Sequence, residues 1–204
     1  MPPAFHAITT GLLNGLLFFA LLAVIVRIVL QWRGSDPRSR LAVATDQTAL
    51  WAVVVGLVMS LAAIITGFTI WAPAAAINSP VMRNKLLTAA LLVVTYVIFI
   101  GIRLMLGESL WRSKVVSAFY GMVALAGFHW SMVTSSIGGD IAGIPSGYET
   151  IVRVSGVETR FTYYLPTWTL IVIAVLSIAM LVVALTDKES AQTSADRTDA
   201  PARS

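Results

Sequence analysis

ITTGLLNGLLFFALLAVIVRIVLQ, the stretch formed by residues 8–31, contains one charged side chain, Arg27, in an otherwise apolar run. A helix needs about 20 mostly apolar residues to cross a hydrocarbon core of roughly 30 Å. Within lipid, the backbone N–H and C=O groups must be satisfied inside the segment, which favours a helix. The stretch therefore predicts a transmembrane helix.

Four more runs of this kind follow along the chain. The five predicted spans cover about 8–31, 50–72, 86–106, 115–134 and 167–186. The composition agrees, because 57% of the 204 residues are hydrophobic and 12% are charged, whereas soluble domains carry roughly 25% charged residues. We therefore expect an all-α integral membrane protein. Its membrane domain, residues 1–186, would be a bundle of five transmembrane helices in a lipid bilayer.

Orientation follows from the basic residues, which accumulate on the cytoplasmic side of membrane proteins. With the amino terminus outside, the cytoplasmic side receives Arg27, Arg33, Arg38, Arg40, Arg103, Arg112, Lys114 and Lys188, and the outer side receives Arg83, Lys85, Arg153 and Arg160. Tryptophans favour both interfaces. Trp32, Trp51 and Trp111 fall at predicted inner ends, and Trp71, Trp130 and Trp168 at outer ends. We expect a multi-pass protein of the cytoplasmic membrane with its amino terminus outside and its carboxyl terminus in the cytoplasm.

The segments between the spans are predicted to be short, with one exception. Residues 33–48 read as a polar connector, in which Thr45 or Asp46 would cap the second helix. Residues 187–204 lack large apolar side chains and are expected to form a disordered cytoplasmic tail. The net charge of +4 follows this topology, so no nucleic-acid partner is expected.

The exception is the outer segment 135–166. Its first part, 136–147, is rich in glycine and predicts a loop. Two runs rich in β-branched and aromatic residues follow, 148–154 and 157–163, and Ser155–Gly156 separates them. This pattern predicts a small outer β-hairpin between the fourth and fifth spans.

Small residues recur at a spacing of four in three spans. The pairs are Gly11 with Gly15, Gly56 with Ser60, and Ser117 with Gly121. Such spacing lets helices approach closely in lipid. The neighbouring helix could belong to this chain or to another subunit.

Polar residues inside spans are costly and therefore informative about function. The predicted topology places several in the outer half of the membrane, and we call the following set the outer polar cluster: Asn14, Thr66, Thr88, Ser131 and Asp140. Near the inner ends lie Arg27 and Arg103, whose long stems could bring the guanidinium groups to the headgroups. Alternatively, the two arginines could bind an anionic lipid or a quinone headgroup.

The histidines suggest a possible cofactor site. His129 is the one histidine inside a predicted span, Met132 lies on the same helix face, and His6 lies at the outer boundary. His and Met can ligate haem or copper, and two histidines suffice for one b-type haem. His129 could instead be hydrogen-bonded within the protein or handle protons. The metal, if any, is unknown from the sequence.

No pattern of catalytic residues is recognisable. The chain has no cysteine, no pair of carboxylates within the bilayer and no nucleophile or zinc motif. We therefore expect no catalytic activity of its own. The leading hypothesis is a subunit that packs with other membrane proteins in a larger complex, such as a respiratory or electron-transfer assembly. The alternatives are a small haem b or quinone-binding protein that uses His129, and a permease or channel for small solutes.

Overall fold

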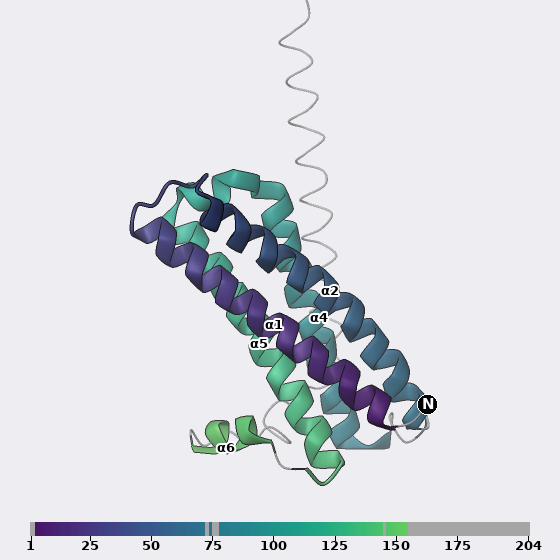
Figure 1. The fold of residues 1–204 in the computed structure, drawn as a ribbon. Coiled ribbons are helices and arrows are strands. Elements are labelled where there is room, and N and C mark those ends of the chain that lie inside the picture. Colours follow the sequence, from purple (N-terminus) through teal and green to yellow (C-terminus); the bar gives the residue numbers. More distant parts are fainter. Residues whose placement is uncertain (1–2, 72–73, 75–77, 145, 155–204) are drawn as a thin grey trace, which may run out of the picture. The chain divides into compact units, whose positions relative to one another are not determined.

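The computed structural model describes residues 3–71, 74, 78–144 and 146–154, all within Met1–Tyr164, the first of two compact units of the chain. Its long helices are α1 (Pro3–Trp32), α2 (Arg40–Ile70), α4 (Pro80–Leu106) and α5 (Lys114–Ile141). The short elements are a 3₁₀ helix, η1 (Gly107–Arg112), and α6 (Gly147–Val154). Successive long helices run antiparallel (Figure 1). We call the end where α1 and α4 begin the His6 end, and the opposite end the Arg27 end.

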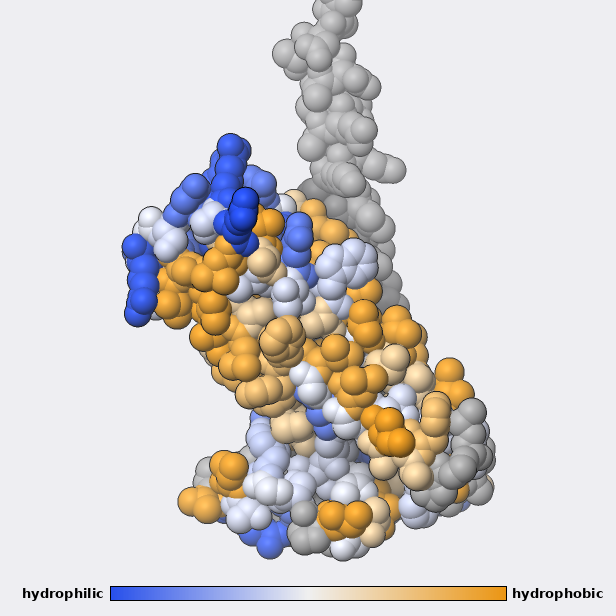
Figure 2. Space-filling view, viewed as in Figure 1, coloured by the Kyte–Doolittle hydropathy of each residue, from blue (hydrophilic) through white to orange (hydrophobic). Residues whose placement is uncertain are grey.

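Each of the four long helices is long and apolar enough to cross a membrane. Large apolar side chains are exposed along all of them, among them Leu12, Phe19, Trp51, Ile65, Leu104 and Phe119. In Figure 2 hydrophobic residues cover much of the middle of the visible face, and hydrophilic ones gather where α1 passes into α2. Exposed apolar surface on this scale fits contact with lipid. The chain is a multi-pass membrane protein.

Serine residues set where three of the helices begin. The hydroxyl oxygens of Ser39, Ser79 and Ser113 accept hydrogen bonds from backbone N–H groups in the first turns of α2, α4 and α5. Because Ser39 caps α2, the helix begins at Arg40. The polar connector predicted at 33–48 is therefore too long, since its residues from Arg40 onward are helical. The cap predicted at Thr45 or Asp46 is also wrong, since both residues lie inside the helix.

The prediction also differs from the structure after the fourth span. Helix α5 continues into the predicted loop 136–147 as far as Ile141, because a helix keeps its backbone groups satisfied at a cost of about 1 kcal/mol per glycine. Residues 147–154 form α6 instead of the first strand of a hairpin. The Ser146 hydroxyl accepts from the Glu149 N–H at 3.0 Å, and Arg153 pairs with Glu149 at 2.7 Å. This local capping and pairing outweighs the β-propensity of the segment.

Several predicted features lie outside the described residues. They are the second strand at 157–163, the fifth span at 167–186 and the tail at 187–204. Within the ranges given above, the secondary structure is helical and contains no strand. The structure thus supports four candidate spans.

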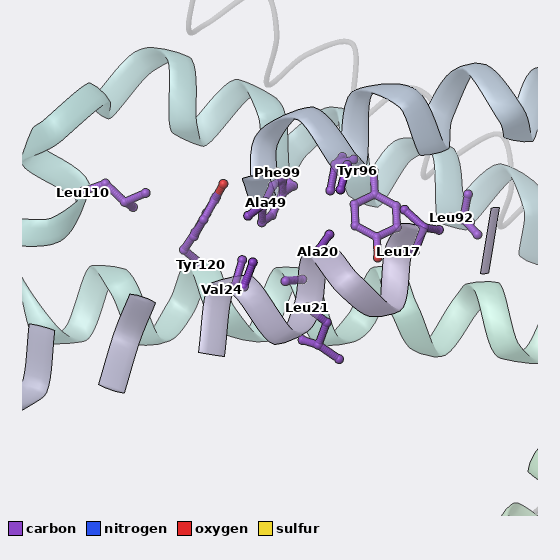
Figure 3. Close-up of a cluster of buried hydrophobic side chains, with 14 of the residues drawn as sticks. Leu17, Ala20, Leu21, Val24, Ala49, Leu92, Tyr96, Phe99, Leu110 and Tyr120 are labelled. Carbon is purple, nitrogen blue, oxygen red and sulfur yellow. The ribbon is translucent and has the colours of Figure 1, made fainter. Parts of the chain in front are cut away.

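The core is a continuous apolar layer between the helices, which Figure 3 shows as a row of side chains. Aromatic rings form its thickest part. Phe99 of α4 stacks on Tyr120 of α5 with ring centroids 4.1 Å apart, and Tyr120 meets the edge of Trp111 at 5.7 Å. These rings join α4, η1 and α5 and extend the core to the Arg27 end.

Glycines allow the closest helix contacts. A Cβ atom added at Gly56 would lie 2.7 Å from Leu17, and one at Gly121 would lie 2.7 Å from Ile28, so both glycines pack against α1. Ser60 and Ser117, which lie four residues from these glycines, are buried. The Gly11 and Gly15 pair differs, because an added Cβ at either position meets no atom of the described chain within 4 Å.

Candidate functional site

A cavity of about 750 Å³ lies at the His6 end, and all four long helices line it. Its walls are mostly apolar, with Leu13, Phe68, Trp71 and Leu92 among the lining residues. Eight lining residues are polar: His6, Thr10, Asn14, Ser60, Lys85, Ser131, Thr134 and Ser135. An apolar cavity with a few polar groups is the usual form of a binding site for a small molecule.

Hydrogen bonds across helices hold part of this lining in place. Asn14 of α1 donates to the Ser135 hydroxyl at 2.8 Å, and the Ser131 hydroxyl donates to the Asn14 side-chain oxygen at 2.5 Å. The Thr134 hydroxyl donates to that of Thr88 on α4 at 2.9 Å. The structure therefore brings Asn14, Thr88 and Ser131 of the outer polar cluster into one region between α1, α4 and α5.

Two polar groups of the lining have no hydrogen-bond or ion-pair partner among the described residues. Ser60 is 4% exposed, and its hydroxyl has no hydrogen-bond partner among the described residues. Lys85 is half-buried against α5, where its Nζ atom lies 2.8 Å from the position of a Cβ added at Gly138. No carboxylate of the described chain forms an ion pair with Lys85, and no acidic residue lines the cavity. A cation in an acid-free apolar cavity favours negatively charged or strongly hydrogen-bond-accepting ligands.

The two histidines have different surroundings. His6 lines the cavity, and its Nδ1 atom lies 3.0 Å from the hydroxyl of Thr66. His129 lies outside the lining, with its Nδ1 atom 2.5 Å from the Tyr148 hydroxyl of α6. Each histidine thus interacts with a separate partner. The structure does not bring them together as a pair of axial haem ligands.

Four other residues proposed from the sequence also lie outside the cavity lining. They are Thr66 on α2, Thr88 on α4, and Met132 and Asp140 on α5. Across the described ranges, no three His, Cys, Asp or Glu side chains gather as a metal site would require. The candidate site therefore consists of the cavity lining, with His6, Asn14 and Ser131 as its members among the residues proposed from the sequence.

A second group of polar side chains lies at the Arg27 end. Arg103 of α4 holds Asp46 of α2 in a two-pronged ion pair, with Nε to Oδ1 at 2.9 Å and Nη2 to Oδ2 at 2.5 Å. Arg27 of α1 is 3% exposed, and its guanidinium carbon lies 4.5 Å from the centre of a Trp111 ring. The sequence suggested that both guanidinium groups extend to the lipid headgroups. In the structure, each of them instead contacts a side chain of the bundle.

The ion pair of Asp46 is a feature of this end that the sequence did not reveal. Asp46 was assigned to a helix cap, although its charge lies only a few residues before an apolar run. The available signal was Ser39, since a helix that begins after Ser39 carries Asp46 into the bundle.

Comparison with known proteins adds no further guide, because no protein-family model, no curated protein and no solved structure matches the chain.

Proposed function

We propose that this protein binds an amphipathic membrane molecule in the cavity at the His6 end. The apolar body of the molecule would lie between the helices, and its head would lie among the polar lining residues. The observation that carries this proposal is the cavity of about 750 Å³, which no acidic residue of the described chain lines. Helix α4 contributes Lys85 to the lining, and α2 contributes Ser60, whose hydroxyl has no partner among the described residues. Its size is within the roughly 300–1,000 Å³ typical of ligand pockets.

The lining residues limit the chemistry of the head. Lys85 would pair with a carboxylate or phosphate, or donate a hydrogen bond to a carbonyl oxygen. His6 and Ser60 can also hydrogen-bond to such oxygens. The head therefore carries oxygen atoms that accept hydrogen bonds. It is either the anionic head of a lipid or the neutral carbonyl of a quinone. These two sources differ in charge, so a change at Lys85 distinguishes them.

The charge distribution supports an orientation for the site. Around the Arg27 end lie Arg33, Arg38, Arg40, Arg112 and Lys114, whereas Arg83, Lys85 and Arg153 belong to the His6 end. Because basic residues favour the cytoplasmic side, we place the Arg27 end in the cytoplasm. The ligand would then enter the protein in the outer half of the cytoplasmic membrane.

Replacing Lys85 by methionine should weaken the binding of oleate by a factor of about 10 to 100, because one charge-assisted hydrogen bond contributes about 1.5–3 kcal/mol. Binding of the neutral probe decylubiquinone should weaken less, because its carbonyl oxygen loses a hydrogen bond but no ion pair. The measurement is calorimetric titration of the purified protein in detergent. Oleate binding alone would identify a lipid ligand, and quinone binding alone would identify a quinone.

Two further variants control this experiment. Ala89→Phe places a ring in the cavity wall and should weaken both probes. Lys114→Met removes an exposed cation at the Arg27 end and should leave both affinities unchanged. Wild-type protein that binds neither probe, or an Ala89→Phe variant that binds as tightly as wild type, would refute the proposal.

A second candidate function is that of a subunit in a larger membrane complex, such as an electron-transfer assembly. Gly11 and Gly15 are exposed on α1, and no described atom lies near the position of their missing side chains. A helix of another subunit could approach closely there. Gly15→Leu should then remove co-purifying subunits from native gels, and Gly101→Leu on α4 should not. Unchanged composition in the Gly15→Leu sample would argue against this function.

A further inference from the structure

The Arg27 end contains a guanidinium group whose charge is not balanced by the described chain. Arg27 is almost completely buried, and its Nε atom has no hydrogen-bond partner. The Asp46 carboxylate attracts Arg27 electrostatically but forms its ion pair with Arg103. Glu108 of η1 is exposed and pairs with neither arginine. The cluster formed by Arg27, Arg103 and Asp46 therefore has a net charge of +1.

Two neighbouring atoms are also unsatisfied. Trp111 is 5% exposed, and its indole N–H has no acceptor among the described residues. Gln31 lies one turn after Arg27 on α1 and donates from Nε2 to the Trp111 carbonyl oxygen at 2.7 Å, but its own Oε1 atom has no donor. Arg27 Nε and Trp111 Nε1 thus give two partnerless donors, and Gln31 adds one partnerless acceptor.

A buried positive charge beside partnerless donors and a partnerless acceptor is energetically unfavourable unless a ligand binds there. A buried polar group without a partner destabilises the folded state, and a buried charged group does so more strongly. Cation–π contact with the Trp111 ring offsets part of the cost for Arg27, but it satisfies no N–H group. An acceptor with a negative charge would serve both donors and neutralise the cluster.

We infer that Arg27 and Trp111 form a binding site for a small inorganic anion of halide size. Arg27 Nε and the Trp111 indole N–H donate hydrogen bonds to the anion, and the charge of the cluster falls to zero. A water molecule of its hydration shell donates to Gln31 Oε1. The near-complete burial of Arg27 and Trp111 favours a monoatomic anion over a lipid phosphate. This site is separate from the cavity, since none of its residues lines that cavity.

The test compares the thermal unfolding of the full chain in chloride and in gluconate at equal ionic strength. An anion that binds only the folded protein raises Tm, and we expect an increase of about 3 °C in saturating chloride. Arg27→Gln should remove the difference between the salts. Arg38→Gln, which changes an exposed arginine, should retain it.

A milder variant guards against misfolding of Arg27→Gln. Trp111→Phe keeps a ring beneath the guanidinium but removes the indole N–H, so about tenfold more chloride should be needed for the same rise in Tm. Equal Tm values of the wild type in chloride and gluconate would overturn the inference and leave water as the partner of these groups. If Tm depended on chloride in Trp111→Phe as it does in the wild type, the Trp111 indole N–H would be excluded as a donor to the anion.

Discussion

Asp46→Ala should lower the free energy of unfolding by about 2–3 kcal/mol, because it leaves the half-buried Arg103 guanidinium without its carboxylate partner. The ion pair joins α2 to α4, and both oxygens of Asp46 accept hydrogen bonds from Arg103. Its loss also removes the negative charge that attracts Arg27. The measurement is reversible unfolding by SDS in mixed micelles.

A double variant separates the loss of the pair from the loss of packing. Asp46→Leu combined with Arg103→Met replaces both charges by apolar groups and should recover most of the stability, because an apolar pair avoids the cost of burying charge. Asp36→Asn, an exposed change in the α1–α2 connection that keeps the acceptor for the Arg38 N–H, should alter stability by about 0.5 kcal/mol or less. The ion pair would be contradicted if the double variant lost as much stability as the two single variants together.

Gly127→Ala should destabilise the protein by about 2 kcal/mol through overpacking. The added Cβ would lie 2.7 Å from Cζ and 2.8 Å from Cε2 of Tyr96. Tyr96 is 1% exposed and meets the ring of Phe99, so its ring has little room to move. Helices α4 and α5 would therefore have to separate. The same SDS titration measures the effect.

The matched control is Gly101→Ala on α4, where the added Cβ meets nothing within 4 Å. Alanine favours a helix over glycine by up to about 1 kcal/mol, so this variant should be as stable as wild type or more stable. Tyr96→Leu should rescue Gly127→Ala, because the clashing ring atoms are gone. A neutral Gly127→Ala variant would show that the contact between α4 and α5 is looser than the structure indicates.

The sequence identified the four described spans because their apolar runs are long and separated by charges. The helix ends were harder to predict. The apolar run of α2 begins near Leu50, but its helix begins at Arg40, since Asp46 is paired across the bundle and Ser39 supplies the cap. Likewise, β-branched residues suggested a strand at 148–154, where the Ser146 cap stabilises α6.

The candidate site was predicted in part. Asn14 and Ser131 could be recognised because polar residues inside a span are costly, and His6 because a histidine at the outer boundary is a possible ligand. All three line the cavity. Lys85 was counted as an outer charge, and Ser60 as a packing residue. Hydropathy does not reveal which face of a helix meets a cavity, so the role of these two residues depends on tertiary structure.

The most direct test of the central claim is mass spectrometry of small molecules retained by the protein after extraction into polymer nanodiscs. The account predicts one amphipathic species with an oxygen-acceptor head, bound near one per chain and enriched over the surrounding lipid. Its amount should fall in Ala89→Phe and stay constant in Lys114→Met. Retained lipid identical to the bulk membrane, or equal amounts in wild type and Ala89→Phe, would contradict ligand binding in the cavity.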